Sequence, residues 1–233
     1  MSEAPFLLIL AGPNGSGKST LTNYLIEVGI DFGEYINPDE IALTLSVPEP
    51  QRSKRAQELA DGHRDRCLSE RLNFSFETVM SHQSKVDVLL RAAAAGYDVT
   101  LYFVCTSDPE INIRRVQNRV SLGGHDVPRD RIVARYWRSL NLLCGAAQVA
   151  RRSVLFDNSA EVRYLANSLL PNPQNGLRPV CQVVRNGKDY AITLGSDTPA
   201  WALQFLVNPL DELARSIGSG VTLAIDRKTE PLR

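Results

Sequence analysis

The 233-residue chain lacks an excess of charge of either sign, because 26 lysines and arginines balance 26 aspartates and glutamates. It therefore offers no overall basic surface for nucleic acid or for an anionic membrane. No apolar run approaches the roughly 18 residues of a membrane-spanning helix, and the N-terminus has neither the basic start nor the cleavage site of a secretion signal. These absences predict a cytoplasmic protein that binds neither nucleic acid nor membranes.

Cysteine is scarce, and the four cysteines are widely spaced at Cys67, Cys105, Cys144 and Cys181. No CxxC pair is present, so the pattern is unlike a zinc site or a small disulfide-stabilised domain. We expect all four to be reduced thiols that serve in packing.

A phosphate-binding motif lies near the N-terminus. The sequence GPNGSGKS, residues 12 to 19, matches GxxxxGK[ST] and directly follows the apolar run FLLILA. Glycines allow the backbone N–H groups to converge on an anion, and the following helix adds the positive end of its dipole. Lys18 is expected to reach the β- and γ-phosphates, and the Ser19 hydroxyl to coordinate Mg²⁺. The predicted nucleotide-binding residues are Gly12, Asn14, Gly15, Ser16, Gly17, Lys18, Ser19 and Thr20.

Strands alternate with helices through the first two thirds of the chain, which is typical of a parallel sheet covered on both faces. Residues 1–160 are therefore expected to form an α/β, three-layer P-loop NTPase core with a mostly parallel five-stranded sheet. The expected strands are 6–11, 33–37, 73–77, 98–105 and 154–157. The expected helices are 18–28, 38–45, 49–72, 81–95, 108–122 and 129–152.

The remaining segment, 161–233, has a different character. Residues 180–194 predict a β-hairpin whose turn is at Asn186 and Gly187, and residues 197–216 predict a closing helix. The last dozen residues are expected to fray. This extension is expected to pack on the core, with a dimer contact as the alternative.

Two carboxylates follow predicted strands at the edge where the phosphate loop lies. Asp39 could accept the proton of a substrate hydroxyl, or could simply favour the positive end of a helix. Glu77, followed by Thr78, could hold a substrate hydroxyl or a Mg²⁺-bound water, or could cap the next helix. The residues alone leave both alternatives open.

Arginines are concentrated between residues 114 and 138, at 114, 115, 119, 129, 131, 135 and 138, with no lysine among them. Arginine forks onto phosphate oxygens, so the cluster predicts a lid that closes over a triphosphate. A solvated helical face is the competing interpretation. His125, beside two glycines, could be a hinge contact or a substrate ligand, whereas His63 and His82 are expected to be ordinary surface residues.

Several motifs in order, LAGPNGSGKST, INPDEIA, FSFETVMS, RVSLGGHDVP, RYWRSLNLL and VLFDNS, resemble the zeta-toxin family of P-loop kinases in its solitary chromosomal branch. The match covers roughly residues 5 to 160. The resemblance implies an enzyme that uses ATP (or GTP) and Mg²⁺ to phosphorylate a UDP-activated amino sugar such as UDP-N-acetylglucosamine. It also implies an antitoxin protein as a partner.

By this resemblance Asp39 falls on the catalytic base, and Glu77 and Thr78 fall on the substrate-holding strand end. The paired lid arginines map to Arg119 and Arg135, with Arg129 and Arg131 as substitutes. Family members usually have a small residue after the glutamate and a polar residue two positions after it, whereas this chain has Thr78 and then Val79, so the acceptor can differ.

Two other functions remain compatible with the motifs. One is a metabolic kinase of the same build with another acceptor. The other is an ATPase or nucleotide switch that acts on a protein partner and uses Asp157 as a Mg²⁺-side carboxylate. Against the second, the chain has no LSGGQ-like signature and no NKxD-type base reader.

Overall fold

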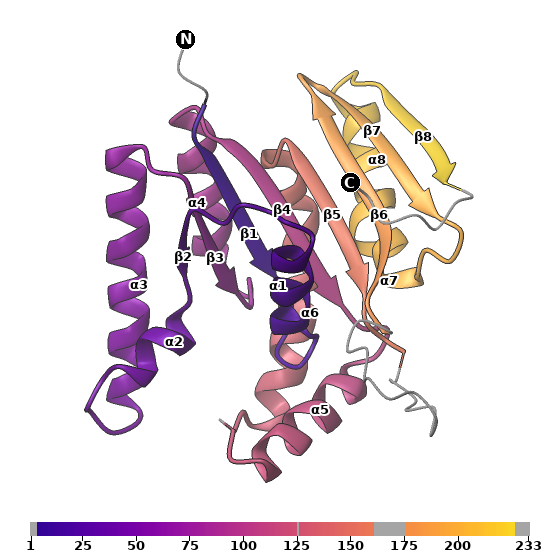
Figure 1. The fold of residues 1–233 in the computed structure, drawn as a ribbon. Coiled ribbons are helices and arrows are strands. Elements are labelled where there is room, and N and C mark those ends of the chain that lie inside the picture. Colours follow the sequence, from indigo (N-terminus) through magenta and orange to yellow (C-terminus); the bar gives the residue numbers. More distant parts are fainter. Residues whose placement is uncertain (1–3, 125, 161–175, 227–233) are drawn as a thin grey trace.

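The computed structural model describes residues 4–124, 126–160 and 176–226 (Figure 1). The strands are β1 (Phe6–Ala11), β2 (Glu34–Ile36), β3 (Phe74–Thr78), β4 (Asp98–Cys105), β5 (Arg152–Asp157), β6 (Arg178–Asn186), β7 (Asp189–Gly195) and β8 (Val221–Asp226). The helices are α1 (Lys18–Glu27), α2 (Pro38–Leu43), α3 (Gln51–Glu70), α4 (Gln83–Ala94), α5 (Pro109–Ser121), α6 (Arg129–Val149), α7 (Ala200–Ala202), the π-helix η1 (Leu203–Val207) and α8 (Asn208–Ser216).

The eight strands form one sheet in the order β2-β3-β1-β4-β5-β6-β7-β8. Strands β1 to β5 run parallel to one another, and β6 is antiparallel to both β5 and β7. This arrangement confirms the predicted α/β P-loop fold with a mostly parallel sheet, a C-terminal hairpin and a helix. The chain leaves β1 for β2 on one side and returns to β4 on the other, so the carboxyl end of β1 is a topological switch point where ligands bind.

The C-terminal part corrects two expectations, the five-stranded sheet and the frayed tail. The hairpin extends the main sheet, and β8 pairs in parallel with β7, from Tyr190 opposite Val221 to Gly195 opposite Asp226. Within the tail that was expected to fray, residues 222–226 therefore belong to a strand, and residues 227–233 lie outside the described residues. A single short run such as VTLAID becomes a strand only where a neighbour supplies its hydrogen bonds, which the sequence does not show.

The hairpin turn and the closing helix also differ in detail. Asn186 pairs with Asp189, so the turn residues are Gly187 and Lys188, one position later than expected, and Gly187 has φ of +65°. The closing helix is not continuous, because the π-helix η1 interrupts it just before Pro209. Proline has no N–H to donate to the preceding turn, which accounts for the altered hydrogen bonding there.

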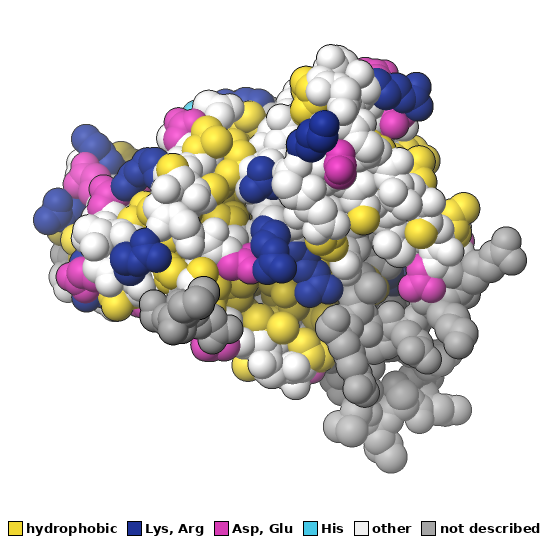
Figure 2. All heavy atoms as spheres, turned by 90° about the horizontal axis from the view of Figure 1, so that it is seen from above, with side chains coloured by type: hydrophobic (Ala, Val, Ile, Leu, Met, Phe, Trp, Pro, Cys, Tyr) yellow, Lys and Arg dark blue, Asp and Glu magenta, His cyan; other side chains and the backbone are white. Residues whose placement is uncertain are grey.

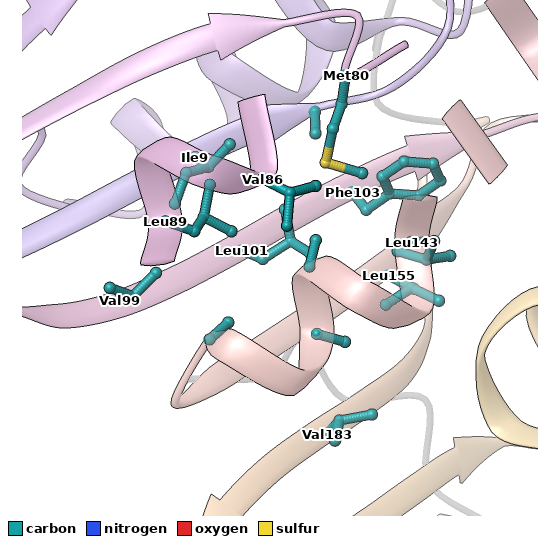
Figure 3. Packing of buried hydrophobic residues seen from close by; sticks show 14 of the residues in the cluster. Ile9, Met80, Val86, Leu89, Val99, Leu101, Phe103, Leu143, Leu155 and Val183 are labelled. Carbon is teal, nitrogen blue, oxygen red and sulfur yellow. The ribbon is translucent and has the colours of Figure 1, made fainter. Parts of the chain in front are cut away.

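Alternate residues of the central strands enter two hydrophobic clusters on opposite faces of the sheet. On one face, side chains such as Leu7, Ile9 and Phe103 pack under α3, α4, α6 and α8. Figure 3 shows part of this cluster, with Met80 directed toward Phe103. On the other face, Leu8 and Leu10 pack against α1, which lies in front of the sheet in Figure 1. Burial on both faces explains why these strands are continuous apolar runs.

The cysteines fulfil the packing prediction. All four are free; Cys67, Cys105 and Cys181 are buried, and Cys144 is partly buried. Burial raises the pKa of Cys67 to about 11 and that of Cys181 to about 12, so these thiols stay protonated and unreactive near neutral pH.

The described surface carries mixed charges. On the face shown in Figure 2, Lys and Arg side chains lie beside Asp and Glu side chains. Among the helices of the described ranges, none combines the length and the apolar character that crossing a lipid bilayer requires.

Asp157, at the end of β5, joins the C-terminal helices to the sheet. Its side chain is 2% exposed and accepts hydrogen bonds from the Trp201 indole N–H at 3.3 Å, the Ser159 hydroxyl at 2.6 Å and the Arg178 guanidinium at 3.2 Å. A buried carboxylate needs such donors because its charge is costly to desolvate. Asp157 therefore supports the packing of α7 on the sheet.

We expect Trp201→Phe to lower the free energy of unfolding by about 1–3 kcal/mol, because the smaller phenyl ring leaves part of the buried site unfilled and Asp157 loses one donor. Chemical denaturation followed by circular dichroism would measure the change. The matched control is Trp137→Phe, since Trp137 is 45% exposed and donates no hydrogen bond to Asp157. Equal stability of Trp201→Phe and the wild type would show that the indole N–H is not needed there.

Candidate active site

The phosphate loop occupies the turn between β1 and α1, as its motif predicts. Gly15 has φ of +74°, and a Cβ added there would lie 2.5 Å from the carbonyl oxygen of Asn112 in α5. Gly17 is the N-cap of α1 with φ of +101°, and a Cβ there would overlap the side-chain amide of Asn158. Glycine is therefore required at both positions, by conformation and by close approach.

Side chains from three distant segments hold the loop in place. The Asn112 amide donates to the Asn14 carbonyl at 2.6 Å, and the Asn158 amide donates to the Ser16 carbonyl at 2.9 Å. The Arg135 guanidinium donates to the Asn14 side-chain oxygen at 3.2 Å. The roles of Asn112 and Asn158 were not predicted. The one available signal for Asn158 was its position directly after β5, at the same sheet edge as the loop.

Lys18 lies inside the loop, and its ammonium group donates to the carbonyl oxygens of Gly12 at 3.1 Å and Pro13 at 3.3 Å. Burial lowers the pKa of Lys18, and the charges of Glu77 and Asp39 act against that lowering. A cation in such a setting is well suited to bind phosphate oxygens, which would supply more negative charge.

A pocket of about 680 Å³ opens in front of the loop. It contains most of the predicted site residues, namely Asn14, Gly15, Gly17, Lys18, Ser19, Thr20, Asp39, Glu77, Thr78, Arg119 and Arg135. Gly12 and Ser16 are buried behind this lining. His125 lies outside the described residues. The volume falls in the range of small-molecule and cofactor sites.

Asp39 lies near the start of α2 with an exposed side chain that lines the pocket. The helix cap comes from another residue, because the Asn37 side-chain oxygen accepts a hydrogen bond from the Asp39 backbone N–H at 3.0 Å. The Asp39 carboxylate is therefore not the hydrogen-bonding cap of α2. Its charge lies in the first turn of α2 and favours the positive end of that helix, while the carboxylate also lines the pocket, so both interpretations of Asp39 stay open.

Glu77, at the end of β3, is held by two donors. Its Oε1 accepts hydrogen bonds from the Thr22 hydroxyl at 2.7 Å and the Tyr35 hydroxyl at 2.8 Å. Burial, followed by the charge of Glu77, raises the pKa of Tyr35, so the phenol stays a donor. The alternative in which Glu77 caps the next helix is wrong, because α4 begins after His82, well beyond this residue. Glu77 instead links α1, β2 and β3 beneath the pocket.

The arginine cluster divides into two groups. Arg115 and Arg119 of α5 and Arg135 of α6 line the pocket. Burial, and then the charges of Arg131 and Arg138, lower the pKa of Arg135. By contrast, the exposed Arg129 pairs with Glu110, and Arg138 donates to the Ala134 carbonyl within α6. The solvated-face interpretation therefore holds for Arg129 and Arg138. That the pocket-lining arginines belong to a lid over a triphosphate stays a prediction.

The far end of the pocket was not predicted. It is formed by α3 and the start of α4, and its residues include Ser53, Gln57, Arg64, Ser81, His82 and Lys85. His82, expected to be an ordinary surface residue, is exposed and also lines the pocket. A polar helix such as α3 carries no motif, so only its packing beside β2 and β3 could show that Arg64 faces the pocket.

The pocket fits a Mg²⁺ ion bound together with nucleotide phosphates. Mg²⁺ usually keeps several waters and takes one or two protein oxygens in such sites. The Ser19 hydroxyl lines the pocket with Asp39 and Glu77 nearby in the lining. Among the described residues no group of three or more His, Cys, Asp or Glu is placed to hold a metal ion.

We expect Gly15→Ala to weaken nucleotide binding by at least about 10-fold, because a Cβ must push the loop away from Asn112 and the backbone N–H groups then no longer converge. Titration with a fluorescent ATP analogue would measure the affinity. The control is Gly145→Ala in α6, where an added Cβ meets nothing within 4 Å. Unchanged affinity in Gly15→Ala would show that the loop does not bind the phosphates.

Comparison with known proteins identifies a matching family model, a related sequence and solved structures that are similar to this chain. The family model AAA_33, described as an AAA domain, matches residues 7–143. An uncharacterized protein of Haemophilus influenzae is 29% identical over 133 residues, which are 55% of this chain and 91% of that protein.

Two solved structures match this chain to different extents. The AvrRxo1-ORF1:AvrRxo1-ORF2 structure with sulphate ions matches with a TM-score of 0.56 and 16% identity, over 77% of this chain and 59% of that chain. This chain thus spans little more than half the length of that protein. The PezAT chromosomal toxin-antitoxin system of Streptococcus pneumoniae matches with a TM-score of 0.49 and 17% identity, over 74% of this chain and 77% of that chain.

Proposed function

The chain belongs to the AAA_33 family of AAA domains, and on that premise we propose that it is an ATP-dependent small-molecule kinase. The single observation that carries the proposal is the shared lining of one pocket. The phosphate-loop residue Lys18, the carboxylate of Asp39 and the guanidinium groups of Arg119 and Arg135 all face it. A cation at the phosphates, a base and arginines near the transferring group are recurring parts of sites that transfer phosphoryl groups.

In the proposed reaction the hydroxyl oxygen of the acceptor attacks the γ-phosphorus of ATP. The new O–P bond forms as the bond between the γ-phosphorus and the β,γ-bridging oxygen breaks, and ADP leaves with that electron pair. Asp39 takes the hydroxyl proton. Lys18, Arg119 and Arg135 stabilise the negative charge on the phosphoryl oxygens. Bound Mg²⁺, with Ser19 as its protein ligand, would neutralise part of the same charge.

As acceptor we propose the hydroxyl of a UDP-activated sugar, of the UDP-N-acetylglucosamine type. The support is the sequence resemblance to zeta-toxin kinases and the length of the pocket, which continues past Asp39 toward α3 and α4. Glu77 and Thr78 would contact this acceptor. The same resemblance supports an antitoxin protein as a partner and a lid formed by residues 114–138.

The ATPase or switch alternative loses its main support. That alternative used Asp157 as a Mg²⁺-side carboxylate, but the oxygens of Asp157 accept hydrogen bonds from Ser159, Arg178 and Trp201. Asp157 is also not among the residues that line the pocket.

The proposal is tested by incubating the protein with ATP, Mg²⁺ and a panel of UDP-sugars, free sugars and nucleosides. We expect mass spectrometry to show one added phosphate on a UDP-sugar, and chelation by EDTA to abolish the transfer. ATP consumption that needs no acceptor would contradict the kinase assignment. Transfer to a different class of acceptor would support the kinase assignment and contradict the UDP-sugar as its substrate.

A further inference from the structure

The pocket has a second cationic end, remote in sequence from the phosphate loop. Arg64 of α3 is only 2% exposed and lines this end. Its guanidinium carbon lies 4.9 Å from the centre of the Phe76 ring, and its terminal nitrogen pairs with Asp61 one turn earlier. Among the described residues its Nε has no hydrogen-bond partner. A buried guanidinium that the protein leaves incompletely paired is costly.

A second cation lies beside it. Lys85 of α4 also lines the pocket, is 20% exposed and has its ammonium 3.4 Å from the same Asp61 carboxylate. Burial, and then the charge of Arg64, lower the pKa of Lys85. One carboxylate thus serves two cations. Asp61 is 57% exposed and is not a lining residue, so it approaches from the solvent side and screens them weakly.

The start of α4 adds to this cationic end. The helix has 12 residues, its N-cap His82 makes no side-chain capping hydrogen bond, and its first turn contains no acidic residue. Ser81, His82 and Ser84 line the pocket beside Lys85. The positive end of the helix dipole and the hydroxyl groups therefore face the same space as the two cations.

We infer that this end of the pocket, called here the α3/α4 anion site and formed by Arg64, Lys85 and the N-terminus of α4, binds an oxyanion of the acceptor. The group is a phosphate or a carboxylate. The inference rests on the proposed function and narrows it: the acceptor is anionic, its charged group lies between α3 and α4, and its hydroxyl extends past Asp39 toward the phosphate loop. Neutral sugars and nucleosides lack the group that this site requires.

Binding is tested with the phosphate loop already filled. The protein is saturated with AMP-PNP and Mg²⁺ and then titrated calorimetrically with inorganic phosphate and, in a separate arm, with acetate. We expect a further binding event, weakened about 10-fold or more in Lys85→Met, because a charge-assisted contact is lost. Lys85→Arg, which keeps the charge, should retain most of the affinity. The two arms show which oxyanion the site prefers.

The matched control is Arg91→Met, on the same helix. Arg91 pairs with Asp65 of α3, as Lys85 pairs with Asp61, but it is exposed and does not line the pocket. Binding should be unchanged in this variant. Equal affinity in Lys85→Met and the wild type, or no binding to the AMP-PNP complex, would overturn the inference. Lys85→Met leaves Asp61 paired with Arg64, so the fold should be retained; Arg64→Gln is the second variant.

Turnover separates this inference from the proposed function. Matched acceptors are compared, N-acetylglucosamine with its 1-phosphate and glucose with gluconate. We expect transfer only to anionic members, with an acceptor KM raised about 10-fold or more in Lys85→Met and an unchanged KM for ATP. Transfer to neutral acceptors, with an acceptor KM that Lys85→Met does not change, would refute the α3/α4 anion site and leave the kinase assignment standing. Lys85-dependent phosphate binding without transfer to any acceptor would keep the site and refute the kinase.

Discussion

Replacing Asp39 with asparagine is expected to slow phosphoryl transfer by about 10²–10⁴-fold, the usual contribution of a general base. Asparagine has nearly the same shape but cannot accept the hydroxyl proton. The Asp39 side chain is exposed in the pocket, and the cap of α2 is supplied by Asn37, so the fold does not depend on this carboxylate. ATP binding should therefore be nearly unchanged.

The measurement pairs single-turnover transfer of labelled phosphate with a direct titration of ATP affinity. The control is Glu40→Gln, which removes the same charge from the next residue of the same helix. Glu40 is exposed, accepts a weak contact from Asn37 at 3.4 Å and does not line the pocket. We expect Glu40→Gln to behave as the wild type. Full activity of Asp39→Asn would remove Asp39 from the mechanism.

Arg119→Ala is expected to reduce the rate of transfer on the order of 10³-fold, as is typical when an arginine that stabilises the transferring phosphoryl group is lost. Arg119 lines the pocket, and its charge lowers the pKa of Lys18, which places it electrostatically close to the phosphate loop. Since its contribution is made mainly in the transition state, nucleotide affinity should fall much less than turnover does.

Arg129→Ala provides the contrast within the same cluster. Arg129 is exposed and paired with Glu110, and it does not line the pocket. We expect this variant to keep wild-type turnover, because an exposed ion pair contributes little. Rate constants from rapid-quench experiments, with ATP affinities measured in parallel, would separate the two arginines. A parallel loss of binding and turnover in Arg119→Ala would indicate ground-state binding and contradict the proposed role.

Some features of the site could be predicted because they are local. The phosphate loop is a contiguous motif whose glycines are required by its own backbone, as Gly15 and Gly17 show. Asp39 follows a strand that had to end at the same sheet edge as the loop, so its location followed from parallel topology. Its chemical role stays a prediction.

Other features could not be predicted because they depend on contacts between distant segments. The polar partners of Glu77 come from α1 and β2. No sequence motif shows which arginines of the cluster line the pocket, and none shows that Arg64 faces it. Periodicity gives the face of a helix, but not the element that this face meets.

The sequence by itself determined the parallel α/β core and the place of the phosphate loop, because continuous apolar runs, helical periodicity and glycine conformations are all set within a few residues of the chain. Only the tertiary structure decided that β6, β7 and β8 extend the same sheet, that Asn112 and Asn158 hold the loop, and that Arg64 and Lys85 share Asp61. The physical reason is that hydrogen bonds and charge pairs between segments depend on where the packed core brings those segments together.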